Sequence, residues 1–580
     1  MPRRMPRRMP KITRLRVDLA CCLALLMPLA APAQIPARGS AGTGSDASAL
    51  AGGREAAMQS ALSDALKSLQ PARTVPRSEP QATVLQALYR DNGGRLLWFG
   101  DGRPGAAAAA IHATLAAASL HGLRADDYRA AWLGERMAIL RDARPSAAPA
   151  GLAQADVTLT LALLRYLADV RQGRSTVRQI SGVWAPGPGY PDPGALLDAS
   201  RDSARLQRLL DEAAPAYPPY RRLLKARAAY EALVAARRDA PRFAFAGKIE
   251  PGEASPLLPV IASRLVELGD LPAGAAETVR YEGDLVAAVE RFQSRHGLAA
   301  DAVIGKGTVA ALQVPNRHRL RQIDLAVERL RWLPPLAADR VIGVNIPDFR
   351  LRAYARDAGD GALMRQVLES RVVVGKQGRT PTPVFIASLN QVDFNPYWNV
   401  PFSIARGEIL PRLRRDPAYL ERQKMEFVAA DGRTVSREVT TGNLAAVAAG
   451  RMRIRQRPDE QNALGDVKFT MPNSMNIYLH DTPSRTLFSQ SRRDFSHGCI
   501  RVEKPAALAR YALGDDPGWS EASIREAMAG DELRVVRLHK PIPVVVFYTT
   551  ATVEDDGTLR FLPDIYGYDA KLDAAMPEAG

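Results

Sequence analysis

The chain has 580 residues, of which 46% are hydrophobic and 24% are charged, and its formal net charge is +16 at pH 7. This composition excludes a disordered chain and a membrane-embedded one, and the length predicts about three to four domains. The excess of Lys and Arg favours an anionic neighbourhood, with a merely solvated basic surface as the alternative.

The first 33 residues are typical of a cleaved secretory signal. A basic start, "MPRRMPRRMPKITRLRVD", runs into the apolar "LACCLALLMPLA", and small residues stand at Ala31 and Ala33. The apolar run is short and Pro28 interrupts it, so an uncleaved membrane anchor is the weaker alternative. Removal of residues 1–33 takes away seven basic residues and one acidic residue, which lowers the net charge from +16 to +10. An exported chain rarely meets nucleic acid, so a cell wall or membrane surface fits this charge better.

Cysteine is rare in this chain, and its positions single out one residue. Cys21 and Cys22 lie in the predicted signal, so cleavage would leave Cys499 as the only cysteine. In an oxidising compartment a lone thiol cannot form a disulfide within its own chain. Cys499 is therefore either buried and inert or retained for its reactivity.

The chain from 34 to 250 is predicted to be a linker followed by helices. Residues 34–80 are rich in Ala, Gly, Ser and Pro, which predicts a flexible linker. From 81 to 250, apolar residues recur every three to four positions, as in "VTLTLALLRYLADVRQG", and this period predicts amphipathic helices. His112 and His121 are isolated there, so we interpret residues 81–250 as a helical scaffold domain without a catalytic set.

Residues 251–316 are predicted to form a small helical domain. "SPLLPVIASRLVELGDL" and "LVAAVERFQSRHGLAADAVIGKGTVAAL" give two or three short amphipathic helices joined by turns that contain glycine. We expect Phe292, Leu298 and Leu312 in the core. The residues that could identify this part are Val289, Phe292, Gln293, Gly297, Leu298, Asp301, Gly305, Thr308 and Leu312. In their order and spacing they resemble the peptidoglycan-binding module, although that family usually has glycine where Ala302 stands. The resemblance implies peptidoglycan as a partner.

Residues 325–550 are predicted to form a mainly β domain. Runs such as "RVVVG", "VFIASLNQVDF", "MNIYLHD" and "IPVVVFYTTATV" are rich in β-branched residues and are bounded by Pro, Gly and Asp. Residues 403–460 interrupt the strands with a helical insertion, which could be a lid over a site or a surface elaboration. We expect residues 551–580 to be a C-terminal tail, and the fold class to be multidomain α+β.

The stretch "DFSHGCIRV" surrounds Cys499 with residues that could activate a thiol. A nucleophilic cysteine needs a base, a group that holds the base, and donors for the oxyanion that forms. A free thiol is only about 3% thiolate at neutral pH, so a nearby imidazole would help. His480 and His497 are the histidines that lie close in sequence, and the backbone amides of Gly498 and Cys499 are candidate oxyanion donors.

A purely structural role and a zinc-binding role for Cys499 are both less favoured. A free cysteine is often a small buried hydrophobe, but the surrounding His, Ser and Gly are poor core material. A zinc site formed by Cys499, His497 and His480 would lack the fourth ligand and the paired cysteines that structural zinc sites normally use.

The histidine–cysteine segment is similar to a known signature. "HDTPSRTLFSQSRRDFSHGCIRV" resembles the signature of L,D-transpeptidases, a histidine followed by Ser/Thr-His-Gly-Cys at this spacing. The segments "VVVGKQGRTPTPVF", "FNPYWNVPFSIA" and "IPVVVFYTTATVEDDGTLRFLPDIYG" extend the likeness to the large periplasmic branch of that family. Its members combine a helical scaffold, a peptidoglycan-binding module and the catalytic β domain. Arg501 stands where many members have Asn, so any role of that Asn does not transfer.

The resemblance implies a role for each matched residue. Cys499 is the expected nucleophile, His480 the base, and the backbone carbonyl of Asp481 the group that orients the imidazole. His497 and Gly498 are expected to shape the oxyanion site. The expected substrate-binding residues are Tyr397, Trp398, Asn399, Ser496 and Arg501. Arg501 is also expected to hold the loop. For Tyr397 and Trp398, the alternative is that they only pack in the core.

The implied reaction is an acyl transfer in two steps. Cys499 forms a thioester with the third, meso-diaminopimelyl residue of a donor tetrapeptide stem and releases the terminal D-alanine. The amine of an acceptor stem then resolves the thioester and gives a 3→3 cross-link. This chemistry needs no metal or organic cofactor. Carbapenem-type inhibitors are expected to acylate the thiol, and the expected location is the periplasm, in association with the cell wall.

Three alternative functions remain open. The same thioester could be resolved by water, as in an L,D-carboxypeptidase, or by a lipoprotein lysine. A cysteine peptidase of the wall usually has its cysteine before its histidine, whereas His480 precedes Cys499 here. A non-enzymatic wall-binding protein would explain residues 255–312 and leave the histidine–cysteine set unexplained.

Overall fold

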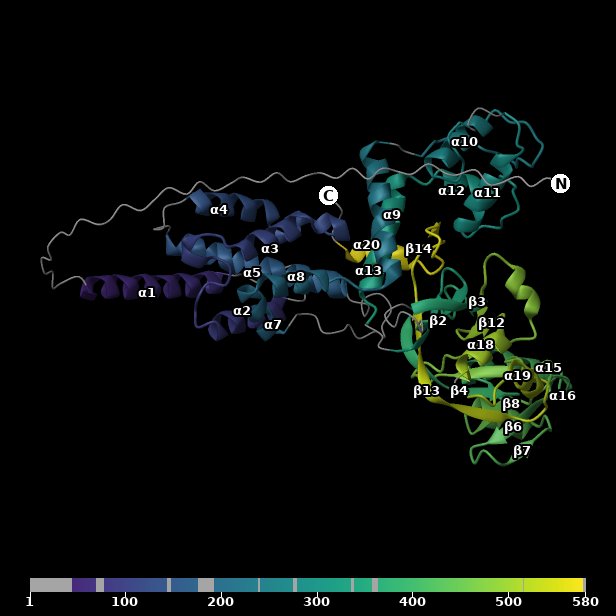
Figure 1. Ribbon diagram of the computed structural model, residues 1–580. Coiled ribbons are helices and arrows are strands. Elements are labelled where there is room, and N and C mark those ends of the chain that lie inside the picture. The colour runs from purple at the N-terminus through teal and green to yellow at the C-terminus, as the bar shows by residue number, and fades with distance from the viewer. Residues whose placement is uncertain are drawn as a thin grey trace, which may run out of the picture. The chain divides into compact units, whose positions relative to one another are not determined.

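A computed structural model describes most of the chain (Figure 1). The described ranges are 44–68, 78–142, 148–175, 192–237, 240–274, 279–334, 338–356, 364–514 and 516–576. The chain divides into two compact units, Met1–Ala57 and Met58–Gly580. The predicted secretory signal lies outside the described residues. Among the helices that are described, none has the length and apolar character needed to cross a membrane.

Helix α1 (Gly44–Ser68) occupies much of the segment that we predicted to be a flexible linker. The prediction is wrong for these residues, because the segment is rich in Ala and Leu, which favour helix strongly enough to outweigh its glycines. Within the second unit, Leu62 of this helix is buried in the hydrophobic cluster of the scaffold region. The remaining parts of the predicted linker lie mainly outside the described residues.

The scaffold region is helical, as predicted. Its core includes Asp156, a fully buried carboxylate that accepts hydrogen bonds from the amides of Leu97, Trp98 and Phe99 and from the Tyr89 hydroxyl. These donors satisfy the carboxylate and tie the segment before α3 to α5. The helices are α2 (Ser78–Asp91), α3 (Ala106–Ala116), α4 (Ala130–Asp142), α5 (Pro149–Gln172), α7 (Pro193–Arg201), α8 (Ser203–Asp211) and α9 (Pro218–Ala235), with short helices η1 (Gly100–Gly102), η2 (Ala118–His121) and η3 (Ala125–Tyr128).

Three short helices follow, α10 (Leu258–Glu267), α11 (Asp284–Arg295) and α12 (Lys306–Leu312). Phe292 and Leu312 are fully buried in their core, whereas Leu298, which we expected there, is only partly buried. Ala302 adopts φ +58°, a left-handed conformation that favours glycine. Its amide donates to the buried Gln293 Oε1 at 3.0 Å, which holds the turn in place of the glycine.

The β domain is built on a nine-stranded sheet that follows helix α13 (Asn316–Arg331). The strand order is β11-β3-β12-β10-β9-β4-β13-β1-β2, and an additional pairing of β2 with β3 closes the sheet on itself. Helices α18 (Pro505–Ala512) and α19 (Glu521–Met528) and the short helix η5 (Arg485–Ser489) complete it. The strands are β1 (Arg340–Asn345), β2 (Arg350–Arg356), β3 (Met364–Gly375), β4 (Phe385–Phe394), β9 (Val467–Thr470), β10 (Leu479–His480), β11 (Asp494–Ser496), β12 (Ile500–Val502) and β13 (Arg534–Phe547).

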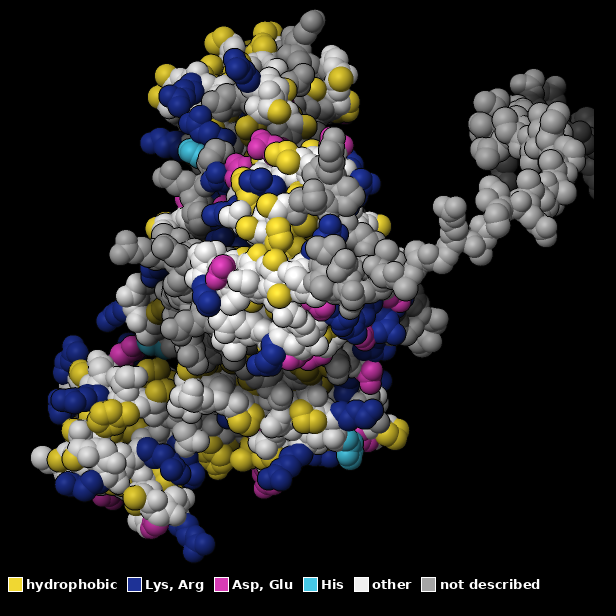
Figure 2. Space-filling model, turned by 90° about the vertical axis from the view of Figure 1, so that its left-hand side faces the viewer, with side chains coloured by type: hydrophobic (Ala, Val, Ile, Leu, Met, Phe, Trp, Pro, Cys, Tyr) yellow, Lys and Arg dark blue, Asp and Glu magenta, His cyan; other side chains and the backbone are white. Residues whose placement is uncertain are grey.

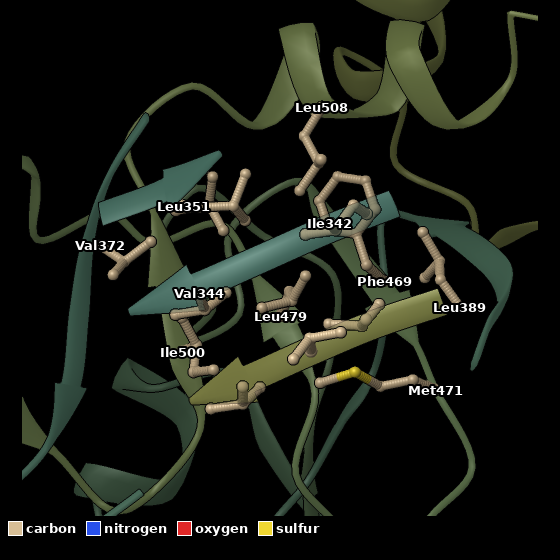
Figure 3. Packing of buried hydrophobic residues seen from close by; sticks show 14 of the residues in the cluster. Ile342, Val344, Leu351, Val372, Leu389, Phe469, Met471, Leu479, Ile500 and Leu508 are labelled. Atoms are coloured by element: carbon tan, nitrogen blue, oxygen red, sulfur yellow. The ribbon is translucent and has the colours of Figure 1, made fainter. Parts of the chain in front are cut away.

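The interior of this sheet fixes the register of the strands that carry the candidate site. Leu479 of β10 and Ile500 of β12 are fully buried, and they lie opposite each other in a parallel pair (Figure 3). Because side chains alternate along a strand, His480 and Cys499 come from positions next to these core residues. A slip by one residue would exchange core and site positions, so burial of the leucine and isoleucine specifies the site.

The predicted insertion is a subdomain with its own small sheet and core, defined here as residues 398–456. The description as a helical insertion is therefore wrong in part, because short runs such as "MEFVA" and "MRIRQ" form strands. Phe427, Ile454 and Leu413 are fully buried in its core. Its sheet has the order β5-β8-β6-β7, and Figure 1 labels β6, β7 and β8. The elements are β5 (Trp398–Asn399), α14 (Phe402–Ile404), η4 (Ala405–Ile409), α15 (Leu410–Arg415), α16 (Tyr419–Arg422), β6 (Met425–Ala429), β7 (Val435–Ser436), α17 (Thr441–Ala448) and β8 (Met452–Gln456).

The segment predicted to be a C-terminal tail is folded. Strands β14 (Ala551–Val553) and β15 (Leu559–Phe561) pair with each other, and helix α20 (Tyr568–Ala575) follows. The prediction of a tail is wrong here, because Phe561 is buried against helix α9 and Leu572 of α20 is buried in the core of the β domain. With these corrections, the multidomain α+β fold class predicted from the sequence is confirmed.

Candidate active site

The loop between β11 and β12 presents Cys499, and glycine is required beside it. Gly498 adopts φ +115°, which other residues rarely do, and a Cβ atom there would lie 3.2 Å from Ile477 Cδ1. The carbonyl of Gly498 accepts a hydrogen bond from Thr382 Oγ1 at 2.7 Å. Backbone conformation and a second segment of chain therefore fix where β12 begins and where the thiol lies.

Ser496 holds the same loop from inside. It is buried, and its hydroxyl donates to the Cys499 carbonyl at 2.5 Å and accepts from the Gly498 amide at 3.1 Å. In this geometry the Ser496 hydroxyl and the Gly498 amide are bonded to each other within the loop. The roles of Ser496 in substrate binding and of Gly498 in the oxyanion site stay predictions.

The thiol of Cys499 is partly buried against the core of the β domain. Its sulfur lies 3.7 Å from the carbonyl oxygen of Asn476. Burial raises the pKa of the Cys499 thiol, and hydrogen bonds with Tyr478 and the positive charges of Lys468 and Arg501 offset part of that rise. The thiol is therefore protonated at neutral pH in the absence of substrate.

His480 is buried at the end of β10, with 4% of its surface exposed. Its Nδ1 donates to the carbonyl of Asp481 at 2.5 Å, the contact that the family resemblance implied, so Nε2 is the acceptor of the neutral ring. Burial and the positive charges of Arg501 and Lys468 together lower the pKa of His480 to about 3, although the hydrogen bond with Asp481 acts in the opposite direction. The imidazole is neutral and can accept a proton.

The side chain of Asp481 fixes the turn that carries this carbonyl. One carboxylate oxygen accepts from the Asp466 amide at 3.1 Å and the other from Arg485 Nη1 at 2.9 Å. The backbone of Gly465 passes so close that a Cβ atom there would overlap the carboxylate. The predicted orienting group is thus itself held on two sides.

His497 is about half exposed, and it reaches the inserted subdomain. Its Nε2 lies 2.8 Å from Oε1 of Glu408, in the π-helical turn η4. Glu408 was not predicted from the sequence, because a contact between residues 89 positions apart leaves no local pattern that would show it.

Of the three predicted cleft residues on the 397–399 segment, Trp398 is the one beside Tyr478, the neighbour of the thiol. Burial and the Cys499 thiol raise the pKa of the Tyr478 hydroxyl, and Trp398 partly offsets that rise. The ring of Tyr397 instead packs under the guanidinium of Arg455, 4.4 Å away, and Asn399 is exposed. We had interpreted Tyr478 only as part of a strand.

Arg501 lies beside His480 in the paired strands β10 and β12. It is largely buried, which lowers the pKa of its guanidinium, and its Nε is buried without a hydrogen-bond partner in the part of the chain that the structure describes. The role of Arg501 in substrate binding stays a prediction.

A second segment, residues 375–382, supports the catalytic loop from the side. Thr380 Oγ1 donates to the Ser496 carbonyl at 3.0 Å, and the Lys376 amide donates to the same oxygen at 3.0 Å. The hydroxyl of Thr382 also accepts from the Gly375 amide at 2.8 Å. These supports lie within "VVVGKQGRTPTPVF", a segment that contributed to the family resemblance without roles for its individual residues.

Among the described residues, no three His, Cys, Asp or Glu side chains are placed to hold a metal ion.

A cavity of about 880 Å³ lies away from Cys499. Its lining includes Arg291, Arg295, Glu554 and Arg560, and none of the predicted site residues. Lys and Arg side chains outnumber Asp and Glu on the face shown in Figure 2. The thiol of Cys499, the imidazole of His480 and the hydrogen-bond donors of this loop are the kinds of group that acyl transfer uses.

Comparisons with known families match three separate parts of the chain. Residues 83–226 match a scaffold domain, and residues 260–312 match the model described as "Putative peptidoglycan binding domain". Residues 339–535, which include Cys499 and His480, match the L,D-transpeptidase catalytic domain.

A relative from Haemophilus influenzae, named "Putative L,D-transpeptidase", is 36% identical over 255 residues. The match covers 44% of this chain and 49% of the relative, so the chain spans about half the length of that protein. Two solved structures are more distant. An L,D-transpeptidase from Xylanimonas cellulosilytica is 14% identical, with 53% of this chain and 100% of that chain covered and a TM-score of 0.14. A fused Zn-dependent amidase/peptidase/peptidoglycan-binding domain-containing protein from Clostridium acetobutylicum is 13% identical, with 52% and 99% covered and a TM-score of 0.16.

Proposed function

Because the chain carries an L,D-transpeptidase catalytic domain, a peptidoglycan-binding domain and a scaffold domain, we propose that it forms 3→3 cross-links in peptidoglycan. The catalytic domain supports transpeptidase activity on peptidoglycan, and the identity of the bonds is our proposal. The observation that carries it is the pairing of β10 with β12, which brings a neutral, oriented imidazole beside the strand that begins after Cys499.

In the first step, the sulfur of Cys499 attacks the carbonyl carbon of the meso-diaminopimelyl residue at position 3 of a donor tetrapeptide. His480 Nε2 takes the thiol proton, because its Nδ1 proton is donated to the Asp481 carbonyl. The C–N bond to the terminal D-alanine breaks, and the proton passes from the imidazole to the leaving amine. A thioester and free D-alanine result.

In the second step, the side-chain amine of an acceptor stem attacks the thioester. His480 removes the proton of that amine and returns it to the departing sulfur, which restores the starting thiol and imidazole. Water or a lipoprotein lysine could resolve the same thioester, and these acceptors are the alternatives within this mechanism.

The electrostatics of the site favour proton transfer that is coupled to attack. Burial keeps the Cys499 thiol protonated and the His480 imidazole neutral, so a thiolate–imidazolium pair is not the resting state. Charge separation in a buried site is costly unless substrate is there to share the charge. Because the Gly498 amide is engaged by Ser496, we assign oxyanion donation to the Cys499 amide and leave Gly498 the role of shaping the loop.

Residues 260–312 and the predicted secretory signal support a location at the cell wall in the periplasm. A wall-binding module raises the effective concentration of the catalytic domain on an insoluble substrate and adds nothing to the chemistry. Deletion of residues 251–316 should weaken sedimentation with insoluble wall and spare reaction of the thiol with a carbapenem.

The direct test of the proposed reaction is analysis of muropeptides after purified protein acts on wall that contains tetrapeptide stems. The proposal predicts dimers joined through two diaminopimelyl residues and release of D-alanine, and neither product with Cys499→Ala. Tripeptide monomers alone would indicate an L,D-carboxypeptidase. If lipoprotein is added to the reaction and becomes linked to the wall, the acceptor is a lipoprotein lysine.

A further inference from the structure

We propose that Glu408 is a positioning residue that holds His497 from the inserted subdomain, so that this one residue of the subdomain acts on the active site. The inference rests on the proposed function, since it concerns the same reaction at Cys499. Its basis is the 2.8 Å contact between Glu408 Oε1 and His497 Nε2, which joins the subdomain to the catalytic loop.

The position of Glu408 follows from an irregular helix. Helices α14, η4 and α15 follow one another without a break, and the Leu410 amide bonds to the Ala405 carbonyl, five residues back. Pro411 has no N–H to give to the carbonyl of Gly407, so the regular ladder is interrupted at this point. A π-helical turn of this kind shifts the side chains of one turn relative to the rest, and such turns are frequent at functional sites.

The opposite face of this helix is firmly anchored. Ala405, Ile409, Leu410 and Leu413 are buried in the core of the inserted subdomain. Glu408 therefore projects from a packed element and not from a free loop, so its carboxylate has a defined place. A group that positions another side chain needs support of this sort.

The position of His497 affects the position of the Cys499 thiol, because the residues on either side of His497 are fixed in the same loop. Ser496 and Gly498 on either side are joined by a hydrogen bond, and Ser496 also holds the Cys499 carbonyl. When Glu408 accepts from His497 Nε2–H, a proton is kept on that nitrogen and the ring is held in one orientation. The position of the subdomain is thereby linked to the loop that presents the nucleophile.

The side chains of Glu408 and His497 are each about half exposed, so the pair is expected to contribute little to the free energy of unfolding. Loss of the pair should therefore be felt in the rate of acylation and not in folding. We expect Glu408→Ala to lower the maximal acylation rate by a carbapenem about three- to fivefold, the range open to an exposed pair, without weakening its initial binding.

The test is a double-mutant cycle followed by mass spectrometry of the acylated protein. Glu408→Gln, which keeps an acceptor oxygen, should restore most of the rate, and Glu408→Ala should add nothing to the defect of His497→Ala. Glu438→Ala, on an exposed position of the same subdomain, is the matched control and should react as the wild type does. A Gln variant as slow as the Ala variant, or defects that multiply in the double variant, would overturn the proposal.

A second readout does not depend on the reaction. In histidine-labelled protein, nitrogen NMR should show a proton on His497 Nε2 in the wild type, and Glu408→Ala should change that signal without moving those of the other histidines. An unchanged His497 signal would refute the contact, whereas failure of the wild type to be acylated would refute the proposed function and leave this readout intact.

Discussion

Strands β10 and β12 and the inserted subdomain each hold one histidine of the site, and they do so in different ways. His480 is 4% exposed and is fixed by the register of two core strands and by a carbonyl next to it in sequence. The side chain of His497 is 48% exposed and is held by Glu408, 89 residues away. The buried histidine is therefore set by the fold of the β domain, and the exposed one depends on where the subdomain lies.

This difference predicts unequal effects when each histidine is removed. If His480 is the base, His480→Ala should lower the acylation rate by a carbapenem by about 10²–10⁴ near neutral pH. Raising the pH toward the pKa of the Cys499 thiol should restore part of the rate, because solvent can then supply the thiolate.

His497→Ala should behave differently in the same assay. Its defect should be smaller and should persist at every pH, because thiolate formation does not restore the shape of the oxyanion site. Rescue by high pH in the His497 variant and not in the His480 variant would reverse the two assignments.

The buried histidine should also couple folding to pH. The pKa of His480 falls from about 6.5 in the unfolded chain to about 3 in the folded one, so the unfolded state binds the extra proton between these values. Its contribution to stability is complete above pH 6.5 and is lost as the pH falls through that window, by about 2 kcal/mol between pH 7 and pH 5.

Denaturant unfolding at several pH values measures this loss. Replacement by His480→Gln should flatten the pH dependence, and part of the slope should remain because burial also lowers the pKa of His121 and of His296. An equal slope in wild type and variant would mean that His480 is not buried in its neutral form.

The next largest effect is expected when the hydrogen bonds of Ser496 within the Cys499 loop are removed. Ser496→Ala leaves the Gly498 amide and the Cys499 carbonyl without their partner, and an unsatisfied buried group costs about 1–3 kcal/mol. We expect a loss of stability in that range together with slower acylation. Full activity and stability would show that substrate and not the serine organises this loop.

The smallest effect concerns the peptidoglycan-binding part. Ala302→Gly removes the cost of a left-handed alanine, about 1–2 kcal/mol, and adds about 0.5–1 kcal/mol of unfolded-state entropy. A net gain of about 0.5 kcal/mol in the free energy of unfolding is expected. A loss would mean that the alanine methyl group, in a residue that is 3% exposed, contributes packing of equal size.

Local features of the site could be predicted from the sequence, and distant contacts could not. Cys499 and His480 stand 19 residues apart in a contiguous signature, and the Asp481 carbonyl is adjacent to the ring that it orients. Glu408 and Thr382 reach the same loop from 89 and 116 residues away, so no spacing rule could reveal them.

The fold, too, could be predicted where it depends on local sequence and not where it depends on contacts between distant segments. The long β-branched runs and the 3.6-residue period identified the β domain and the helical regions. Helix α1 was missed because its glycines and serines resembled a linker, and the sheet of the inserted subdomain was missed because its strands are short. Strands β14 and β15 were assigned to a tail, since their burial depends on helix α9, which is more than 300 residues away in sequence.

The central claim is that Cys499 forms a thioester with the donor stem while His480 takes its proton. The most direct measurement is the intact mass of the protein after an acid quench during turnover of a tetrapeptide muropeptide. We predict a mass increase equal to the donor minus D-alanine in the wild type, and none in Cys499→Ala with an unchanged melting temperature. An adduct on the Cys499→Ala variant, or turnover by the wild type with no adduct even when acceptors are withheld, would contradict it.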